Sequence, residues 1–189
     1  MQSVLIVSSG KKSSDALYGL LSTAGYGKIT AIQSCAQARR TLLSQRFELV
    51  VINAPLSDES GEAFAMDVAA SNQSQVILLT RHEHFDAVTL ATEEAGVLCV
   101  SKPIERALLW SALKLARAAG AGMRRMRDEN ETLKQRMEDI AVIDRAKMLL
   151  ISHLAFSEAQ AHRYIEKQAM DMRATKRAIA EEILKTYES

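Results

Sequence analysis

Five polar side chains stand at or just after the ends of apolar stretches in the N-terminal part of the sequence, where residues able to do chemistry are well placed. They are Ser8, Ser9, Asn53, Thr80 and Lys102. The set supplies hydroxyl, amide and ammonium groups but no carboxylate. A hard cation such as Mg²⁺ needs anionic oxygens to offset its dehydration. These residues therefore predict a hydrogen-bonding pocket that holds no metal ion.

The elements that must position these side chains follow from the hydrophobic pattern. Short apolar stretches predict five strands, at residues 4–7, 29–32, 49–52, 76–79 and 97–100. Segments with helical spacing separate them, at residues 14–24, 36–45, 62–70 and 87–94. This alternation predicts an α/β fold, a doubly wound five-stranded parallel sheet with helices on both faces. In such a sheet the functional crevice lies beyond the carboxyl ends of the strands.

The pattern changes to helix alone after residue 104. Apolar residues then recur at alternating intervals of three and four, which indicates a coiled-coil seam. The seam consists of Met123, Met126, Asn130, Leu133, Met137 and Ile140. A single buried Asn130 would fix the register and favour two parallel strands, so we expect a homodimer. The alternative is a helix that packs on its own domain, and Gly120 and Gly122 predict a bend before the coil.

The C-terminal part predicts three helices that are too small to bury much of a core alone. Residues 140–153 extend the long helix or follow it closely. Ser157 and Gln160 form a capping-box pattern at the start of the next helix, and Thr175 is placed to cap the last. We place an α/β domain at residues 1–118, a coiled-coil linker at 119–142 and a small helical domain at 143–189.

Composition bounds the classes of function. The chain has 189 residues and a formal net charge of +1, so any nucleic-acid site must be a local patch. The start of the chain shows no charged leader, and no apolar run reaches membrane-spanning length. We expect a cytoplasmic protein with no membrane partner. Cys35 and Cys99 would then be free thiols that act as small apolar core residues.

The N-terminal part resembles the receiver domains of bacterial response regulators. Thr80 and Lys102 follow the fourth and fifth strands at the family's mutual spacing, and Gly61 stands eight residues after Asn53, where the family places its glycine. The resemblance implies a signalling domain with this doubly wound fold. In that family an acidic pair after the first strand holds Mg²⁺, and an aspartate after the third strand accepts a phosphoryl group.

Three departures from the receiver pattern remove its chemistry together. Ser8 and Ser9 replace the acidic pair, and Asn53 replaces the phosphoacceptor aspartate. An amide oxygen is a far poorer nucleophile than a carboxylate. We therefore expect a pseudo-receiver that is not controlled by aspartyl phosphorylation.

Two interpretations are open for Thr80 and Lys102. They could form a retained switch that responds to another ligand, so that the input partner is a protein or a small molecule. They could instead be inherited residues held by local hydrogen bonds, with Lys102 bonded to Asn53 or to backbone oxygens. Cys99 stands where an aromatic residue often precedes the lysine, which argues against the usual threonine–aromatic switch.

The C-terminal part, from near residue 133, resembles the ANTAR domain, an RNA-binding module of transcription antiterminators. Residues 143–150, 157–161, 168–171 and 179–184 follow that family in order and spacing, with Met148 as a departure. The resemblance implies a dimer that binds paired leader-RNA hairpins and prevents a terminator hairpin from forming. Periodicity alone implies only a dimeric helical tail.

Positive charge in the C-terminal part marks the residues that could contact RNA phosphates. The candidates are Arg145, Lys147, Arg163, Lys167, Arg173, Thr175, Lys176 and Arg177. Lys147 is the strongest because it lies inside the matched family segment. Residues 175–177 are the next strongest candidates, because backbone N–H groups at the start of a helix favour phosphate binding. Each basic residue could instead lie on a solvated face, and Tyr164 fits the core better than a stacked base.

Other classes of function stay open on the sequence alone. A protein-interaction adaptor without a nucleic-acid ligand would not need the basic residues, and DNA is a further possible ligand. No nucleophile–base pair or glycine-rich phosphate loop is recognisable, so we expect a non-enzyme without a cofactor. His82 and His84 flank Glu83 but lack further metal ligands. Trp110 is expected to pack on the first domain or on a dimer partner.

Overall fold

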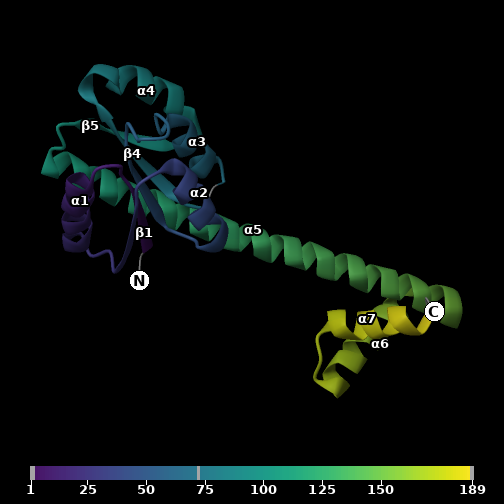
Figure 1. Cartoon of the computed structure of the whole chain (residues 1–189). Helices are drawn as coiled ribbons and strands as arrows, with labels where there is room; N and C mark the ends of the chain where they lie inside the picture. Colours follow the sequence, from purple (N-terminus) through teal and green to yellow (C-terminus); the bar gives the residue numbers. More distant parts are fainter. Residues whose placement is uncertain (1–2, 72, 188–189) are drawn as a thin grey trace. The chain divides into compact units, whose positions relative to one another are not determined.

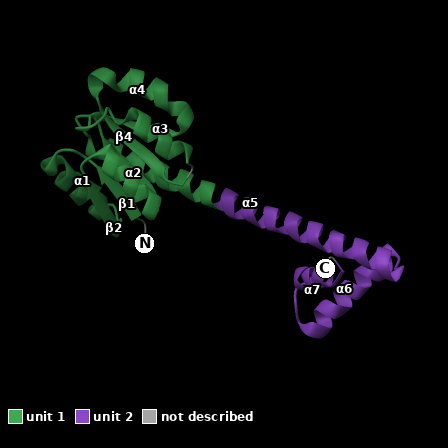
Figure 2. Ribbon diagram, turned by 45° about the vertical axis from the view of Figure 1, so that its right-hand side comes forward, with its two compact units in different colours: residues 1–124 green, residues 125–189 purple. Residues whose placement is uncertain are grey.

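The computed structural model describes residues 3–71 and 73–187. Contacts divide the chain into two compact units, Met1–Arg124 and Arg125–Ser189 (Figure 2). The division falls inside a single helix, α5 (Arg106–Leu154). Among the described residues, no helix is both long enough and apolar enough to cross a membrane.

The first unit alternates strands and helices, as the hydrophobic pattern predicts. Its elements are β1 (Ser3–Val7), α1 (Lys11–Thr23), β2 (Lys28–Ile32), α2 (Cys35–Ser44), β3 (Leu49–Asn53), α3 (Glu62–Ala70), β4 (Gln75–Arg81), α4 (Phe85–Thr92), β5 (Val97–Lys102) and the first part of α5. Figure 1 shows the elements along the chain. All five strands pair in parallel, in the order β2-β1-β3-β4-β5. The predicted doubly wound sheet is therefore confirmed.

Alternate residues of the central strands supply one hydrophobic core on each face of the sheet. Leu5 and Val7 of β1 point into the core that α2, α3 and α4 cover. Val4 and Ile6 pack under α1 and α5 on the other face. Burial on both faces explains why successive strand positions are apolar. Trp110 packs against the second core, as the sequence predicts.

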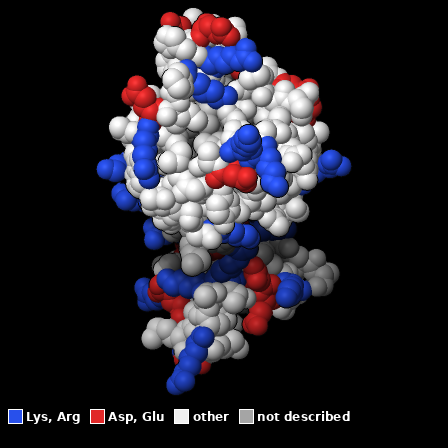
Figure 3. Space-filling view, turned by 60° about the vertical axis from the view of Figure 1, so that its left-hand side comes forward, with Lys and Arg blue, Asp and Glu red and all other residues white. Residues whose placement is uncertain are grey.

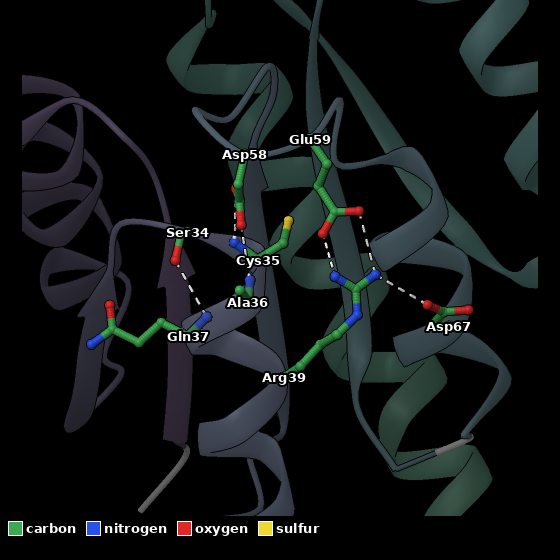
Figure 4. A network of polar contacts seen from close by, with 8 residues as sticks. All are labelled: Ser34, Cys35, Ala36, Gln37, Arg39, Asp58, Glu59 and Asp67. Carbon is green, nitrogen blue, oxygen red and sulfur yellow. Dashed lines mark hydrogen bonds and ion pairs between the residues drawn. The ribbon is translucent and has the colours of Figure 1, made fainter.

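A polar network fastens the segment between β3 and α3 to α2 (Figure 4). The Asp58 carboxylate accepts the backbone N–H groups of Cys35 at 3.1 Å and Ala36 at 2.9 Å, at the start of α2. These hydrogen bonds hold the pKa of Asp58 below its usual range. Glu59 pairs with Arg39 of α2. The loop that follows β3 is thus held by charged contacts that hydrophobic patterning does not reveal.

Both cysteines are free thiols in the core on the α2–α4 face of the sheet. Cys35 is fully buried, and Cys99 is partly buried against the same cluster. Burial raises the pKa of the Cys35 thiol, which keeps it protonated and unreactive. Their predicted role as small apolar core residues is confirmed.

Helix α5 runs without interruption through Gly120 and Gly122, so these glycines do not break the helix. Gly120 instead allows close packing. A Cβ built there would lie 3.2 Å from Cγ of Gln75, at the start of β4. The missing side chain lets α5 approach the start of β4, and the backbone keeps its helical hydrogen bonds.

The second unit consists of the last part of α5, α6 (Glu158–Met172) and α7 (Lys176–Tyr187). Its core is made of alanine and aliphatic side chains from all three helices: Ala146, Leu150, Ala161, Ile165, Ala169, Ile179, Ala180 and Ile183. The predicted capping box of Ser157 and Gln160 is present at the start of α6. Thr175 caps α7 by accepting the N–H of Ala178 at 3.2 Å.

The prediction that Tyr164 lies in this core is wrong. Its residue surface is 38% exposed, and its ring packs edge-on against Phe156, with centroids 5.9 Å apart. The core of the second unit is lined by small residues such as Ala161 and Ala169, so the helices approach closely. The large ring is left at the rim.

Candidate phosphorylation-pocket remnant and nucleic-acid interface

Adjacent strands bring Ser8 and Asn53 together at the carboxyl edge of the sheet. Asn53 Nδ2 donates a hydrogen bond to Ser8 Oγ at 3.0 Å. Ser8 Oγ also lies 2.9 Å from Ser13 Oγ, and Ser8 is only 1% exposed. The hydroxyls and the amide therefore satisfy one another and offer no anionic oxygen to Mg²⁺.

Ser9 contacts a different set of groups. Its Oγ donates to the carbonyl of Gln33 at 3.3 Å and accepts the N–H of Ser57 at 2.8 Å. These bonds join the loop after β2 to the loop after β3. Ser9 is thus a link between loops, and it has no hydrogen bond to Asn53 in the described structure.

Lys102, the last residue of β5, donates from Nζ to the backbone carbonyl of Ala54. The contact fits the interpretation of local bonding to a backbone oxygen. Burial lowers the pKa of the ammonium group, and Arg81 nearby lowers it further. Within residues 3–71 and 73–187, no carboxylate forms an ion pair with Lys102.

Thr80 lies near the end of β4, at the same edge of the sheet, but is bonded to none of these residues. Its residue surface is 5% exposed. In the part of the chain that the structure describes, its hydroxyl makes no hydrogen bond. The described residues also include no group of three or more His, Cys, Asp or Glu side chains that could hold a metal ion. The five predicted residues therefore share an edge but form three separate sets of contacts.

Lys147, the strongest RNA candidate in the sequence, is occupied by contacts inside the second unit. Its Nζ lies 2.7 Å from Oδ1 of Asp144 and 3.4 Å from Oε1 of Glu158. The side chain is only 15% exposed, and its carboxylate partners raise the pKa of the ammonium group. Lys147 joins α5 to α6 and is poorly placed to reach a phosphate.

Lys176 and Arg177, at the start of α7, are paired in the same way. Lys176 binds Glu166 of α6. Arg177 Nη1 lies 2.7 Å from Oδ1 of Asp139 in α5, and its Nε lies 2.9 Å from Oε1 of Glu181. These cations carry counter-charges within their own unit, so they stabilise the helix packing. The i,i+3 spacing of Asp144–Lys147 and the i,i+4 spacing of Arg177–Glu181 were the only signs of this pairing in the sequence.

The remaining candidates include three basic residues on or next to α6 that have no side-chain partner in the described part of the chain. Arg163, Lys167 and Arg173 are exposed, and none forms an ion pair or side-chain hydrogen bond with a residue that the structure describes. Arg163 and Lys167 are one helical turn apart, so they share a face. Arg173 follows the helix in the left-handed conformation, with φ 51°. Arg145 is exposed on α5.

Charge is mixed on the face of the molecule that Figure 3 shows. Figure 3 shows basic and acidic side chains interspersed over the visible face, as the net charge of +1 predicts. A nucleic-acid site must therefore be a small local set, and the cations of α6 without partners meet that description.

The seam residues of α5 are exposed in the single chain. Four have exposed fractions between 57% and 71%: Met126, Leu133, Met137 and Ile140. Asn130 is exposed among them. Met123 differs, because it is half-buried and its Sδ accepts a hydrogen bond from Gln75 Nε2 at 3.3 Å. The apolar stripe without a partner therefore begins at Met126.

Comparisons with known families define the class of the protein. The response regulator receiver domain matches residues 4–114, and the ANTAR domain matches residues 131–184. The chain therefore belongs to the response regulator receiver family, and it carries a C-terminal ANTAR domain. Both resemblances found in the sequence are confirmed, and the arrangement is that of an antitermination-type regulatory protein.

Two relatives are regulators by name. Transcriptional regulatory protein PdtaR of Mycobacterium tuberculosis is 27% identical over 139 residues, which cover 74% of this chain and 68% of that protein. The aliphatic amidase regulator of Pseudomonas aeruginosa is 25% identical over 123 residues, covering 65% of this chain and 63% of that protein.

Solved structures show the same fold in the first unit. The receiver domain of an HD-domain protein from Pseudomonas fluorescens covers 66% of this chain with a TM-score of 0.58 and 23% identity, and 92% of that domain is matched. A two-component response regulator from Clostridium difficile covers 62% of this chain, with 97% of its own chain matched, a TM-score of 0.55 and 19% identity.

Proposed function

We propose that this protein is an antitermination regulator that binds leader-RNA hairpins as a homodimer, and that its input is not aspartyl phosphorylation. The observation that carries the proposal is the combination of an ANTAR domain at residues 131–184 with three cations on or next to α6 that have no counter-charge among the described residues. The receiver pocket supports the second part, because its acidic positions hold Ser8, Ser9 and Asn53. The protein is regulatory and has no catalytic role in this scheme.

The RNA-binding surface in this proposal is the exposed face of α6. Arg163, Lys167 and Arg173 contribute three cations that no carboxylate of the described chain neutralises, so they gain most from phosphate contact. Tyr164 lies beside them with its ring at the surface, and an exposed ring can stack on an unpaired loop base. Arg145 is a further contact from α5. Lys147, Lys176 and Arg177 act indirectly, because they hold together the helices that present this face.

Dimerisation in this proposal uses the exposed stripe of α5. A helix with several large apolar side chains more than half exposed gains by burying them against a second copy. Asn130 in the middle of the stripe would set the register. We propose residues 119–142 as this dimerisation segment, between a pseudo-receiver domain at residues 1–118 and an RNA-binding domain at 143–189.

An RNA gel-shift assay tests the proposal. The full chain is mixed with a two-hairpin leader RNA, and Arg163→Ala/Lys167→Ala is compared with Lys114→Ala, an exposed lysine of the first unit. We expect the double variant to lose binding at least about tenfold, equal to about 1.4 kcal/mol, with unchanged circular dichroism. The Lys114 variant should bind like the wild type.

Other outcomes of the same assay point to other functions. A dimeric protein with no salt-sensitive RNA binding at micromolar concentration would favour the protein-interaction adaptor. Duplex DNA that displaces the hairpin RNA would favour DNA binding. Cytoplasmic location, which this function requires, is tested by fractionation of cells that produce the protein.

A further inference from the structure

Thr80, a mostly buried residue of β4, lines a cavity of about 380 Å³ at the carboxyl edge of the sheet. Ala54 and Pro55, after β3, and Val88 of α4 supply apolar walls. Glu62, the first residue of α3, and Arg81, the last residue of β4, supply charged groups. The cavity lies outside the Ser8–Asn53 hydrogen bond, whose residues do not line it. A mostly apolar hollow of this size with a few polar groups is typical of small-molecule sites.

Thr80 is the first sign that the cavity takes a ligand. Its residue surface is 95% buried, with 5% exposed, and its hydroxyl has no hydrogen-bond partner in the described structure. The Thr80 oxygen is not one of the fully enclosed polar atoms without a partner, so a ligand can reach it. A ligand atom that accepts or donates a hydrogen bond would give this hydroxyl its partner.

The charged groups of the cavity are also short of partners. Within the described residues, the Glu62 carboxylate forms no ion pair or hydrogen bond with another side chain. Arg81 has one carboxylate contact, at 3.4 Å to Glu83, and both side chains are mostly exposed. A pair of this kind contributes little to stability, so the guanidinium group is available to a ligand. One free carboxylate and one available cation therefore border the same cavity.

We propose that this cavity binds a small zwitterion with a short apolar body, of which an α-amino acid is the simplest example. The amine faces Glu62, the anionic group faces Arg81, and the Thr80 hydroxyl completes the hydrogen bonding. The apolar body packs on Ala54, Pro55 and Val88. A molecule with both charges matches the Glu62 carboxylate and the Arg81 guanidinium group, whereas a simple anion would meet the Glu62 carboxylate.

The site lies next to the remnant of the phosphorylation pocket. Lys102 donates to the carbonyl of Ala54, and Ala54 lines the cavity. A ligand packed against Ala54 and Pro55 would therefore contact the same segment whose carbonyl accepts the Lys102 hydrogen bond. The inference goes beyond the proposed function, since ligand binding here does not depend on RNA binding.

Titration of the full chain with L-phenylalanine, followed by ¹⁵N–¹H correlation spectra, tests the inference. Phenethylamine and 3-phenylpropionate carry the same ring with only one of the two charges. We expect saturable shifts of the Ser60, Thr80 and Arg81 amides with L-phenylalanine, and at least about tenfold weaker binding of each single-charge analogue. Equal binding of all three compounds, or no saturable shift with any, would overturn the proposal.

Variants localise the effect. Glu62→Gln removes the carboxylate, and Ala87→Phe fills the cavity from an exposed position of α4. Both should weaken L-phenylalanine binding, whereas Glu94→Gln, an exposed carboxylate outside the cavity, should leave it unchanged. Unfolding curves confirm that each variant is folded. Shifts that persist in Ala87→Phe would place the amino acid elsewhere and overturn the assignment. RNA binding measured on the same samples shows separately whether the proposed function holds.

Discussion

Arg177 of α7 and Asp139 of α5 form an ion pair across the second unit, with Nη1 2.7 Å from Oδ1, although the two residues are 38 positions apart in the chain. The same guanidinium group also binds Glu181. A residue that the sequence presents as a phosphate contact is thus a link between two helices. The same holds for Lys147 and Lys176, so three of the candidate phosphate contacts are neutralised within this unit.

Removing the Asp139 carboxylate should loosen α7 in a pH-dependent manner. Arg177 holds the pKa of Asp139 below its usual range, so the stabilisation is present above the unfolded pKa of about 4 and is lost as the pH falls through the folded pKa. Asp139→Asn should speed hydrogen exchange in α7 at neutral pH, and its difference from the wild type should shrink at an acidic pH below the folded pKa. Glu182→Gln is the control, because the exposed Glu182 side chain forms no ion pair with a described residue. An equal difference at both pH values would contradict this role.

Salt dependence should report the cations of α6 that have no partner. Each phosphate contact contributes about 0.7 to 0.9 to the slope of log affinity against log salt. Arg163→Ala/Lys167→Ala should therefore flatten the slope by roughly 1.4 to 1.8, as filter binding measured over a salt series would show. Lys114→Ala should keep the wild-type slope. An equally flattened slope in both variants would mean that RNA affinity depends on the net charge of the protein and not on the α6 cations in particular.

The receiver domain should not become phosphorylated. Ser8, Ser9 and Asn53 supply neither an anionic site for Mg²⁺ nor a carboxylate nucleophile. Incubation with acetyl phosphate and Mg²⁺ should leave the intact mass of the protein unchanged. A phosphate adduct that peptide mapping places at Asn53 or its neighbours would contradict the pseudo-receiver assignment.

A charge in the seam should separate the proposed dimer. Met137 is 71% exposed in the single chain, and Met137→Asp would place two carboxylates in one apolar contact. Sedimentation velocity should show a dimer for the wild type and a shift toward monomer for this variant. Thr132→Asp adds the same charge outside the seam and should remain dimeric. A wild-type protein that is monomeric at every concentration would contradict the proposed coiled-coil dimer.

Gly61 should resist substitution. It precedes α3 with φ +92°, and a Cβ there would lie 3.2 Å from Cγ2 of Ile52. Gly61→Ala should lower the free energy of unfolding by about 1–3 kcal/mol. Gly19 lies inside α1 with nothing within 4 Å of a built Cβ, so Gly19→Ala should raise it by about 0.5–1 kcal/mol. Chemical denaturation measures both, and effects of the same sign would contradict the backbone argument.

The fold was predictable because its signals are local. Each buried strand is a short apolar run, and Ser157 and Thr175 mark helix starts by capping patterns that need no knowledge of the tertiary structure. The glycines of α5 show the limit of local reasoning. Gly120 reads as a helix breaker, but its role depends on Gln75, which is distant in the sequence and close in space.

The candidate site was predictable only in part, for the same reason. Ser8 and Asn53 could be placed together because parallel strands end at one edge. The partners of Lys147 and Arg177 lie on other helices, so hydrophobic periodicity does not find them. Tyr164 was assigned to the core by spacing, since a helical pattern does not show how narrow a core built from alanines is.

The exposed seam of α5 has a consequence for affinity. A pair of chains joined along it would carry two α6 faces, so binding of the first hairpin raises the effective concentration of the second face near the second hairpin. Weak individual contacts from a few cations then suffice for tight binding. Discrimination between leader RNAs would then depend on the length of the spacer between their two hairpins. An RNA whose spacer does not let both hairpins reach the two α6 faces would bind without this gain in affinity.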